Sequence, residues 1–227
     1  MSSECNRSAN TIFLFAVCLM TTEHFFKFLV DIPLLEYIFT LTGRCAFPFF
    51  SVLASFNLIE NTSSKKKYIF RVFVIAVLSQ PAFGLVSGYE VYNVCFSLAL
   101  GLAFSHLYAT CGCDLFRACV VAFFISLSVA LNGFIEYGLF GVLLTFLSSR
   151  VFCNKFPPLL LLSCAACGAF LNFGNGLQMF ISSTATVLAV TFLKYDLLPF
   201  DFIKIPSLIR RQWYPIHLSI IAIISGL

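Results

Sequence analysis

Apolar residues occur in long runs along almost the whole chain, and short polar or turn-forming stretches separate the runs. The runs lie near residues 11–31, 45–60, 68–86, 93–110, 117–132, 137–149, 158–172, 177–193 and 213–227. A helix of about 20 apolar residues crosses a hydrocarbon core of ~30 Å, and several of these runs approach that length. We therefore predict about nine transmembrane helices. The stretch 34–42 is too short to cross, so we predict an interfacial or re-entrant piece there.

The composition supports the same class of protein. Of 227 residues, 60% are hydrophobic and only 11% are charged, whereas soluble domains have about 25% charged residues. A chain this short has too little interior to hide so much apolar surface from water. We predict an all-α, polytopic integral membrane helical bundle that forms a single transmembrane domain over residues 1–227. The first run is longer than a typical signal-peptide core and lacks a small-residue cleavage site, so we expect it to be a retained span.

The cations separate to one side of the predicted spans. That side holds Arg7, Lys65, Lys66, Lys67, Arg71, Arg117, Arg150, Lys155, Lys194, Lys204, Arg210 and Arg211. The opposite loops hold Asp31, Glu36, Glu90 and Glu136, with Arg44 as their only cation. Because short cytoplasmic loops are enriched in Lys and Arg, we predict a multi-pass protein of the inner (cytoplasmic) membrane with a cytoplasmic N-terminus. The cations behind the net charge of +4 lie in short loops between the spans. Because topology explains this distribution, we expect no nucleic-acid partner.

The ten cysteines do not form a metal-binding pattern. Most lie in or beside predicted spans, and the pair Cys164 and Cys167 is one helical turn apart within an apolar run. Cysteine behaves as a small apolar residue in such places, and further ligands at suitable spacing are missing. We expect helix packing and no metal.

Three ionisable residues lie together inside the first run, namely Glu23, His24 and Lys27. Glu23 and Lys27 are four residues apart with the glutamate first, which favours an ion pair on a helix. We therefore expect these two charges to neutralise one another. His24, about 100° around the helix, would remain a neutral, unpaired imidazole near the middle of the membrane. It either joins helices by hydrogen bonding or faces a functional cavity.

Arg44 precedes a run that Pro48 interrupts early. Its guanidinium either marks the outer membrane boundary by extending to the interface or enters a cavity beside His24. In the cavity it would bind a carboxylate, a phosphate or a developing oxyanion.

Other polar residues are candidates for binding. Lys65, Lys66, Lys67 and Arg71 are a topology signal that also attracts an anionic ligand, and Gln80–Pro81 is expected to end or kink a helix. Asn93 and Glu136 lie at the start of two further apolar runs. His217 lies in the last run, after Trp213 and Tyr214, which we interpret as interface anchors.

The order of several segments resembles the TraX family of polytopic membrane proteins associated with N-terminal acetylation of conjugative pilin. The resemblance is carried by Met20 and His24, "GRCAFPFF" (43–50), "KYIFRVFVIAVLSQPAF" (67–83), "YNVCFSLALGL" (92–102), "EYGLFGVLL" (136–144) and "YPIHL" (214–218). One departure is that Glu23 precedes His24 where the family pattern has an aspartate.

The resemblance implies an acetyltransferase that uses acetyl-CoA as donor and the N-terminal amine of a small membrane-resident pilin as acceptor. His24 would be the general base, Glu23 would hold or polarise the site, and Arg44 would stabilise the oxyanion or anchor a substrate. The expected binding residues are Lys27, Lys65, Lys66, Lys67, Arg71, Gln80, Asn93, Glu136 and His217. The alternatives are a small proton-coupled transporter with Glu23, His24 and Lys27 as an intramembrane relay, and a pilus-assembly scaffold without chemistry.

Overall fold

The computed structural model describes residues 7–88, 90–153, 158–198 and 206–226. Within these ranges the chain forms only helices, joined by short turns and two isolated β-bridges. The α-helices are α1 (Arg7–Leu29), α2 (Pro33–Gly43), α3 (Ala46–Phe56), α4 (Lys65–Ser87), α5 (Val94–Thr110), α6 (Asp114–Ala130), α7 (Gly138–Cys153), α8 (Pro158–Phe170), α9 (Gly176–Tyr195) and α10 (Ser207–Ile224). A π-helical segment, η1 (Asn57–Asn61), extends α3. The prediction of an all-α helical bundle is confirmed.

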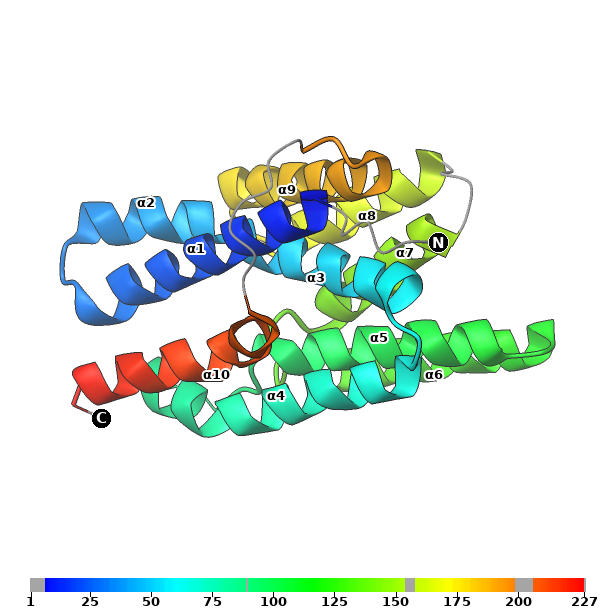
Figure 1. Cartoon of the computed structure of the whole chain (residues 1–227), viewed down its shortest axis with the longest axis horizontal. Coiled ribbons are helices and arrows are strands. Elements are labelled where there is room, and N and C mark those ends of the chain that lie inside the picture. Colours follow the sequence, from blue (N-terminus) through cyan, green and yellow to red (C-terminus); the bar gives the residue numbers. More distant parts are fainter. Residues whose placement is uncertain (1–6, 89, 154–157, 199–205, 227) are drawn as a thin grey trace.

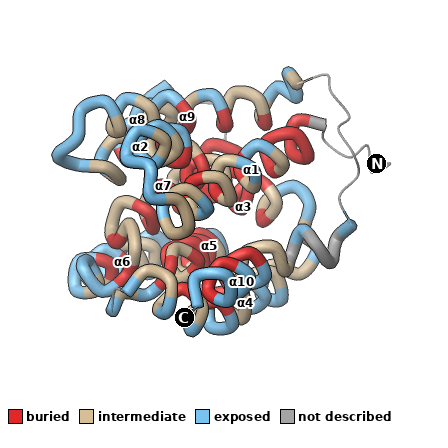
Figure 2. Tube along the Cα trace, turned by 90° about the vertical axis from the view of Figure 1, so that its left-hand side faces the viewer, coloured by how far each residue is buried: buried red, intermediate tan, exposed pale blue. Residues whose placement is uncertain are grey.

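The helices run back and forth along one axis in two layers (Figure 1). One layer contains α1, α2, α3, α7, α8 and α9, and the other contains α4, α5, α6 and α10; Figure 2 shows the same two layers seen from one end. Buried residues concentrate on α1, α3, α5 and α7, toward the middle of the bundle (Figure 2). Described cations lie in the first turns of α4 and α6 and in the last turns of α7 and α9. Figure 1 shows these helix ends on one side of the bundle, which we call the basic end. Lys155 and Lys204 lie outside the described residues.

Four helical stretches in the described ranges are long and apolar enough to cross a membrane, namely Ser8–Leu29, Pro33–Asn61, Lys65–Ser87 and Gly176–Tyr195. Shorter apolar helices pack around them. With α2, α3 and η1 counted as one helix, the order and direction of the helices match the nine predicted runs.

One sequence prediction about helix continuity is wrong. The stretch 34–42 is no separate interfacial or re-entrant piece, because α2 leads into α3 with little change of direction (Figure 1). Arg44 and Cys45 between them keep right-handed helical angles, with φ −59° and −77°. At Gln80–Pro81, where we expected a helix to end or kink, the helix does not end, because α4 continues past Pro81 to Ser87.

Small and hydroxyl side chains bring the central helices together. A Cβ on Gly101 of α5 would lie 2.8 Å from the carbonyl oxygen of Val142 on α7, so only glycine permits this approach. Ser51 and Thr145 share a buried hydrogen bond of 2.8 Å between α3 and α7. In lipid the hydrophobic effect does not drive helices together, so close packing of small residues and hydrogen bonds between hydroxyl groups are the usual contacts between helices.

Candidate functional site

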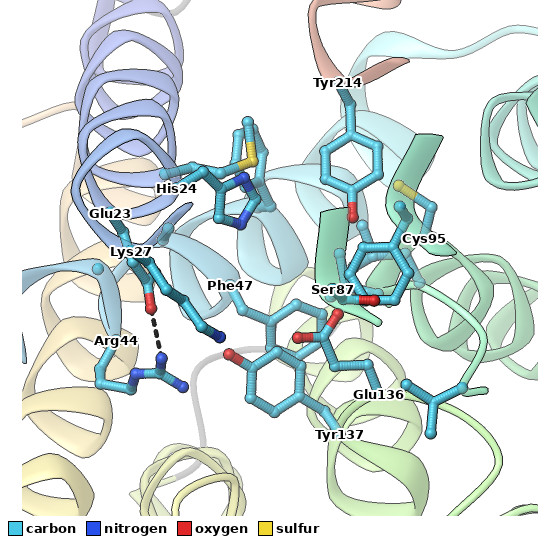
Figure 3. Close-up of a pocket in the computed structure, with 18 of the residues that line it drawn as sticks. Glu23, His24, Lys27, Arg44, Phe47, Ser87, Cys95, Glu136, Tyr137 and Tyr214 are labelled. Carbon is cyan, nitrogen blue, oxygen red and sulfur yellow. Dashed lines mark hydrogen bonds and ion pairs between the residues drawn. The ribbon is translucent and has the colours of Figure 1, made fainter. Parts of the chain in front are cut away.

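A polar cavity of about 280 Å³ lies between α1, the α2–α3 junction, the end of α4, the start of α5, the turn before α7, and α10. We call it the polar cavity. Its charged and polar walls contrast with the apolar helices around it, and Figure 3 shows its labelled side chains directed toward a common space. The polar residues lining it are Glu23, His24, Lys27, Arg44, Ser87, Cys95, Glu136, Tyr137 and Tyr214.

The polar cavity lies away from the basic end. His24 is six residues past the centre of α1, or about 9 Å along the axis. This position is nearer to the far end of the helix than the sequence predicted, because α1 begins at Arg7 and ends at Leu29. The cavity therefore occupies the half of the bundle that is opposite the lysine-rich end.

Glu23 pairs with Arg44 and not with Lys27, so the predicted pair within the helix is wrong. The Nη2 of Arg44 donates to Oε1 of the buried Glu23 carboxylate. The rest of the guanidinium is also held, because Nε donates to the Thr40 carbonyl at 3.2 Å and Nη1 to Asn172 Oδ1 at 3.4 Å. A guanidinium with several fixed donors suits a buried carboxylate better than a flexible ammonium does. Arg44 thus enters the cavity wall rather than extending to the membrane interface.

Gly43 makes room for this ion pair. A Cβ at position 43 would overlap the carboxylate of Glu23 and would lie 2.7 Å from its Cβ. The backbone of α2 therefore presses directly on the Glu23 side chain. The sequence "GR" at 43–44 supplies the space and the cation in adjacent positions.

Lys27 has its ammonium 5.1 Å from the centre of the Phe28 ring. No described acidic group forms an ion pair with it. In Figure 3 its side chain extends toward the hydroxyl group of Tyr137. Lys27 is thus a cation directed at the cavity, where it can meet an anionic group of a ligand.

His24 is hydrogen-bonded to His217, so the prediction of an unpaired imidazole is wrong. His24 Nδ1 lies 2.9 Å from His217 Nε2, and His217 Nδ1 lies 2.9 Å from the carbonyl oxygen of Trp213. A carbonyl only accepts, so Nδ1 of His217 carries a hydrogen. In the neutral ring its Nε2 then accepts from the Nδ1–H of His24. These tautomers follow from the hydrogen-bond network and leave Nε2 of His24 with a free lone pair.

Trp213 and Tyr214 face the interior of the bundle, so their interpretation as interface anchors is wrong. Trp213 Nε1 donates to Thr21 Oγ1 at 2.9 Å, which fixes α10 against α1. Tyr214 lines the polar cavity. The reason is that α10 begins at Ser207, which places both residues well inside the helix rather than at its start.

Glu136 and Tyr137 enter the cavity from the turn before α7. Tyr137 has φ of +62°, a conformation that is strained for a side chain of this size and that recurs at functional sites. Its ring stacks on Phe47 with centroids 4.4 Å apart. Tyr137 was not among the predicted site residues, although it lies in the segment "EYGLFGVLL", because one tyrosine is inconspicuous in an aromatic-rich chain.

Gln80 and Asn93 do not line the polar cavity; they hold the turn that does. Gln80 Nε2 donates to the Val91 carbonyl and its Oε1 accepts from the backbone of Asn93, both at 2.9 Å. Asn93 also caps α5 through the backbone of Cys95. The preceding residue, Tyr92, donates a backbone hydrogen bond of 2.7 Å to the Phe134 carbonyl and accepts one of 2.9 Å from the Glu136 amide.

The lysine-rich segment is separate from the polar cavity. Lys66, Lys67 and Arg71 line a groove of about 740 Å³ at the start of α4, and Lys65 is the first residue of this helix. From Lys67 to Phe83, which lines the polar cavity, α4 extends about 24 Å. The structure therefore places these predicted binding residues away from Glu23, His24, Arg44, Lys27, Glu136 and His217. Among the described residues, no group of three His, Cys, Asp or Glu side chains is arranged to hold a metal ion.

The fold and the polar cavity define a multi-pass helical membrane protein with an ionisable site between its helices. The family model described as TraX protein matches residues 8–225, nearly the whole length, so the chain belongs to the TraX family. Comparisons with curated proteins and with solved structures give no significant match. Family membership supports a pilin-related role in a membrane context.

Proposed function

We propose that this protein is a membrane-embedded acetyltransferase that transfers the acetyl group of acetyl-CoA to the N-terminal amine of a pilin subunit. The proposal places it in the cytoplasmic membrane with a cytoplasmic N-terminus. Its main support is the hydrogen-bond chain from Trp213 through His217 to His24, which leaves Nε2 of His24 with a free lone pair at the polar cavity. Family membership supports the pilin-related context.

In the proposed reaction the neutral amine of the acceptor attacks the thioester carbonyl. A C–N bond forms, and Nε2 of His24 takes the proton that the amine nitrogen loses. The C–S bond then breaks, and the imidazolium returns the proton to the leaving thiolate, so that an amide and a free thiol result. A positioned general base contributes about 10²- to 10⁴-fold to such a rate. His217 acts as a positioning residue, because its Nε2 accepts from His24 Nδ1–H throughout.

The charges around His24 fit the other needs of this reaction. Lys27 and the Tyr137 hydroxyl are directed at the same part of the cavity (Figure 3), where two donors suit the developing oxyanion. Glu136 offers a carboxylate that can bind the incoming ammonium form of the acceptor and take from it the proton whose loss yields the neutral amine. Arg44, which was predicted to have the oxyanion role, is engaged with Glu23. We therefore propose that the Glu23–Arg44 ion pair holds α1 against the α2–α3 junction.

The test is acetylation of a pilin peptide by purified protein in lipid vesicles with acetyl-CoA, followed by mass spectrometry. We expect His24→Gln to lose at least about 10²-fold in rate. His106→Gln is the matched control, because His106 lies on α5 away from the polar cavity and lines an apolar groove. Acetylation at the wild-type rate by His24→Gln would disprove the base assignment. Unmodified pilin together with altered proton or solute flux would favour the transporter.

A further inference from the structure

A second, smaller cavity lies next to the polar cavity. Its volume is about 190 Å³, and we call it the narrow cavity. Phe50, Cys95, Leu98 and Tyr214 line both cavities. The two spaces therefore meet at these four side chains, and the remainder of the narrow cavity extends from this junction in one direction.

That direction is toward the basic end. On α1, Phe13 and Val17 line the narrow cavity, whereas Met20 and His24 line the polar cavity. Phe13 and His24 are separated by about 17 Å along the helix axis. The two cavities thus follow one another along α1, with the narrow cavity nearer to its start.

Helix α4 shows the same order. Tyr68, Val72 and Ile75 line the narrow cavity, and Phe83 and Ser87, farther along the helix, line the polar cavity. Helices α1 and α4 belong to different layers (Figure 1), and each of them lines both cavities, so α1 and α4 form two walls of one elongated space. Its lining is mainly apolar between the basic end and Tyr214.

Cations lie where the narrow cavity approaches the basic end. Arg210 lines it, with its guanidinium 5.3 Å from the Phe13 ring and hydrogen-bonded to Asn10 at 2.7 Å. On the facing helix, the Arg71 guanidinium lies 6.0 Å from the ring of Tyr68. Both rings belong to the wall of the narrow cavity.

The lysine groove adjoins the same place. Arg71 lines the groove and also contacts the ring of Tyr68. Lys66 and Lys67 line the groove beside Arg71. Residues 67 and 68 are neighbours on α4, so the groove and the narrow cavity lie on adjacent faces of its first turns. A phosphate-bearing ligand at this end would meet cations from both α4 and α10.

We infer that the narrow cavity is the passage through which the thioester arm of an acyl-CoA donor reaches His24, with the donor's phosphates held at Lys66, Lys67, Arg71 and Arg210. This inference rests on the proposed function. The donor is a slim chain that connects anionic phosphates to an uncharged thioester. The protein presents the matching sequence of cations, apolar lining and imidazole along one axis. The passage explains how a base in the far half of the bundle meets a donor that approaches from the basic end.

The experiment measures binding of two donors to purified protein: acetyl-CoA, and acetylpantetheine, which has the same thioester arm without phosphates. Val17→Trp places an indole in the narrow cavity without touching the polar cavity. We expect it to raise the Kd of both donors by at least about tenfold, as steric misfit in a binding pocket does. Val72→Trp fills the same space from α4 and serves as a second variant if the first fails to fold.

Two controls separate the passage from the phosphate contacts. Phe15→Trp adds the same side chain on the exposed side of α1, where 51% of Phe15 is accessible, and should leave both Kd values unchanged. Lys67→Gln/Arg71→Gln should weaken acetyl-CoA by roughly fivefold, which is the scale of exposed ion pairs, and leave acetylpantetheine unaffected.

The outcomes distinguish this inference from the proposed function. If wild-type protein binds acetyl-CoA and both Trp variants keep their Kd within about twofold, the passage is wrong while the acetyltransferase proposal stands. If the Trp variants lose binding but His24→Gln still acetylates pilin at the wild-type rate, the passage stands and the base assignment fails. If wild-type protein binds neither donor, both proposals fail.

Discussion

His24 on α1 and His217 on α10 are joined by a hydrogen bond of 2.9 Å, although 193 positions separate them in the sequence. Their rings lie nearly parallel, at 10°. The bond connects the first and last helices of the bundle, and it fixes which nitrogen of His24 carries the hydrogen. The imidazole that we propose as the base and the helix that orients it thus come from opposite ends of the chain.

His217→Gln should reduce kcat by roughly 10²-fold and leave the KM for acetyl-CoA nearly unchanged, because misplacement of a reacting group costs about this much. The substitution removes the acceptor that orients His24 but leaves the cavity wall intact, since His217 does not line it. Steady-state kinetics of pilin acetylation in vesicles measure both constants.

The double variant tests whether the two histidines act as a unit. Groups that act together show strongly non-additive losses, so His24→Gln/His217→Gln should be no slower than His24→Gln alone. An additional tenfold loss in the double variant would show that His217 acts independently of His24. His106→Gln again serves as the matched control, because it exchanges the third histidine for the same residue.

The Glu23–Arg44 ion pair should show strong coupling. Removal of one partner leaves a buried charge without its counter-ion, which costs about 3–5 kcal/mol in buried pairs of soluble proteins. Glu23→Gln and Arg44→Gln should therefore each lower the melting temperature more than Glu23→Gln/Arg44→Gln does. Thermal unfolding of the purified variants in one detergent measures the difference.

The exposed pair Arg117–Asp114 provides the control for this cycle. Its two side chains are 42% and 96% accessible, and such pairs contribute about 0–1 kcal/mol. Arg117→Gln should hardly change the melting temperature. If the double variant at Glu23 and Arg44 is as unstable as the sum of the single variants, the two side chains do not form a structural pair.

Gly43→Ala should lower both stability and activity. A methyl group at this position would overlap the Glu23 carboxylate, and overpacking of this kind costs about 1–3 kcal/mol. Gly84→Ala is the matched control, because a Cβ at Gly84 of α4 meets nothing within 4 Å. Equal melting temperatures and equal rates for the two variants would show that the Glu23 side chain moves aside without cost.

The sequence identified the charged side of the site because ionisable residues are conspicuous in an apolar chain. Glu23, His24, Lys27, Arg44 and Glu136 all line the polar cavity. Their pairing was not predictable from helix spacing. The i, i+4 rule selects Lys27 as the partner of Glu23, but Arg44 takes this place once α2 packs against α1.

The aromatic side of the site was indicated only in part. Tyr137 and Tyr214 contribute hydroxyl groups to the polar cavity. Both belong to segments that carry the family resemblance, but in a chain that is 17% aromatic neither was assigned to the site, and Tyr214 was interpreted as an interface anchor. The position of Tyr214 depends on where α10 begins, which the apolar run starting at 213 places six residues too late. Positive φ at Tyr137 depends on the turn packed around it, which no local pattern reveals.

Asn93→Ala should act on the site from outside it. Asn93 donates to the Ala76 carbonyl at 2.8 Å and caps α5, and loss of a buried hydrogen bond and of a cap each cost about 1–2 kcal/mol. The loop at 91–93 would loosen, and with it the turn that carries Glu136. We expect a lower kcat and faster hydrogen exchange at the amides of Tyr92 and Glu136. In the wild-type protein both amides donate hydrogen bonds between the loop at 91–93 and the turn before α7.

Asn175→Ala is the control that separates this effect from general loss of a helix cap. Asn175 caps α9 through the backbone of Gln178 at 3.1 Å, so the same substitution removes the same type of cap. It does not line the polar cavity or touch the loop at 91–93. Asn175→Ala should therefore destabilise α9 but leave kcat and the exchange rate at Glu136 unchanged. If both variants slow the reaction equally, the loss reflects global stability, and Asn93 does not position Glu136.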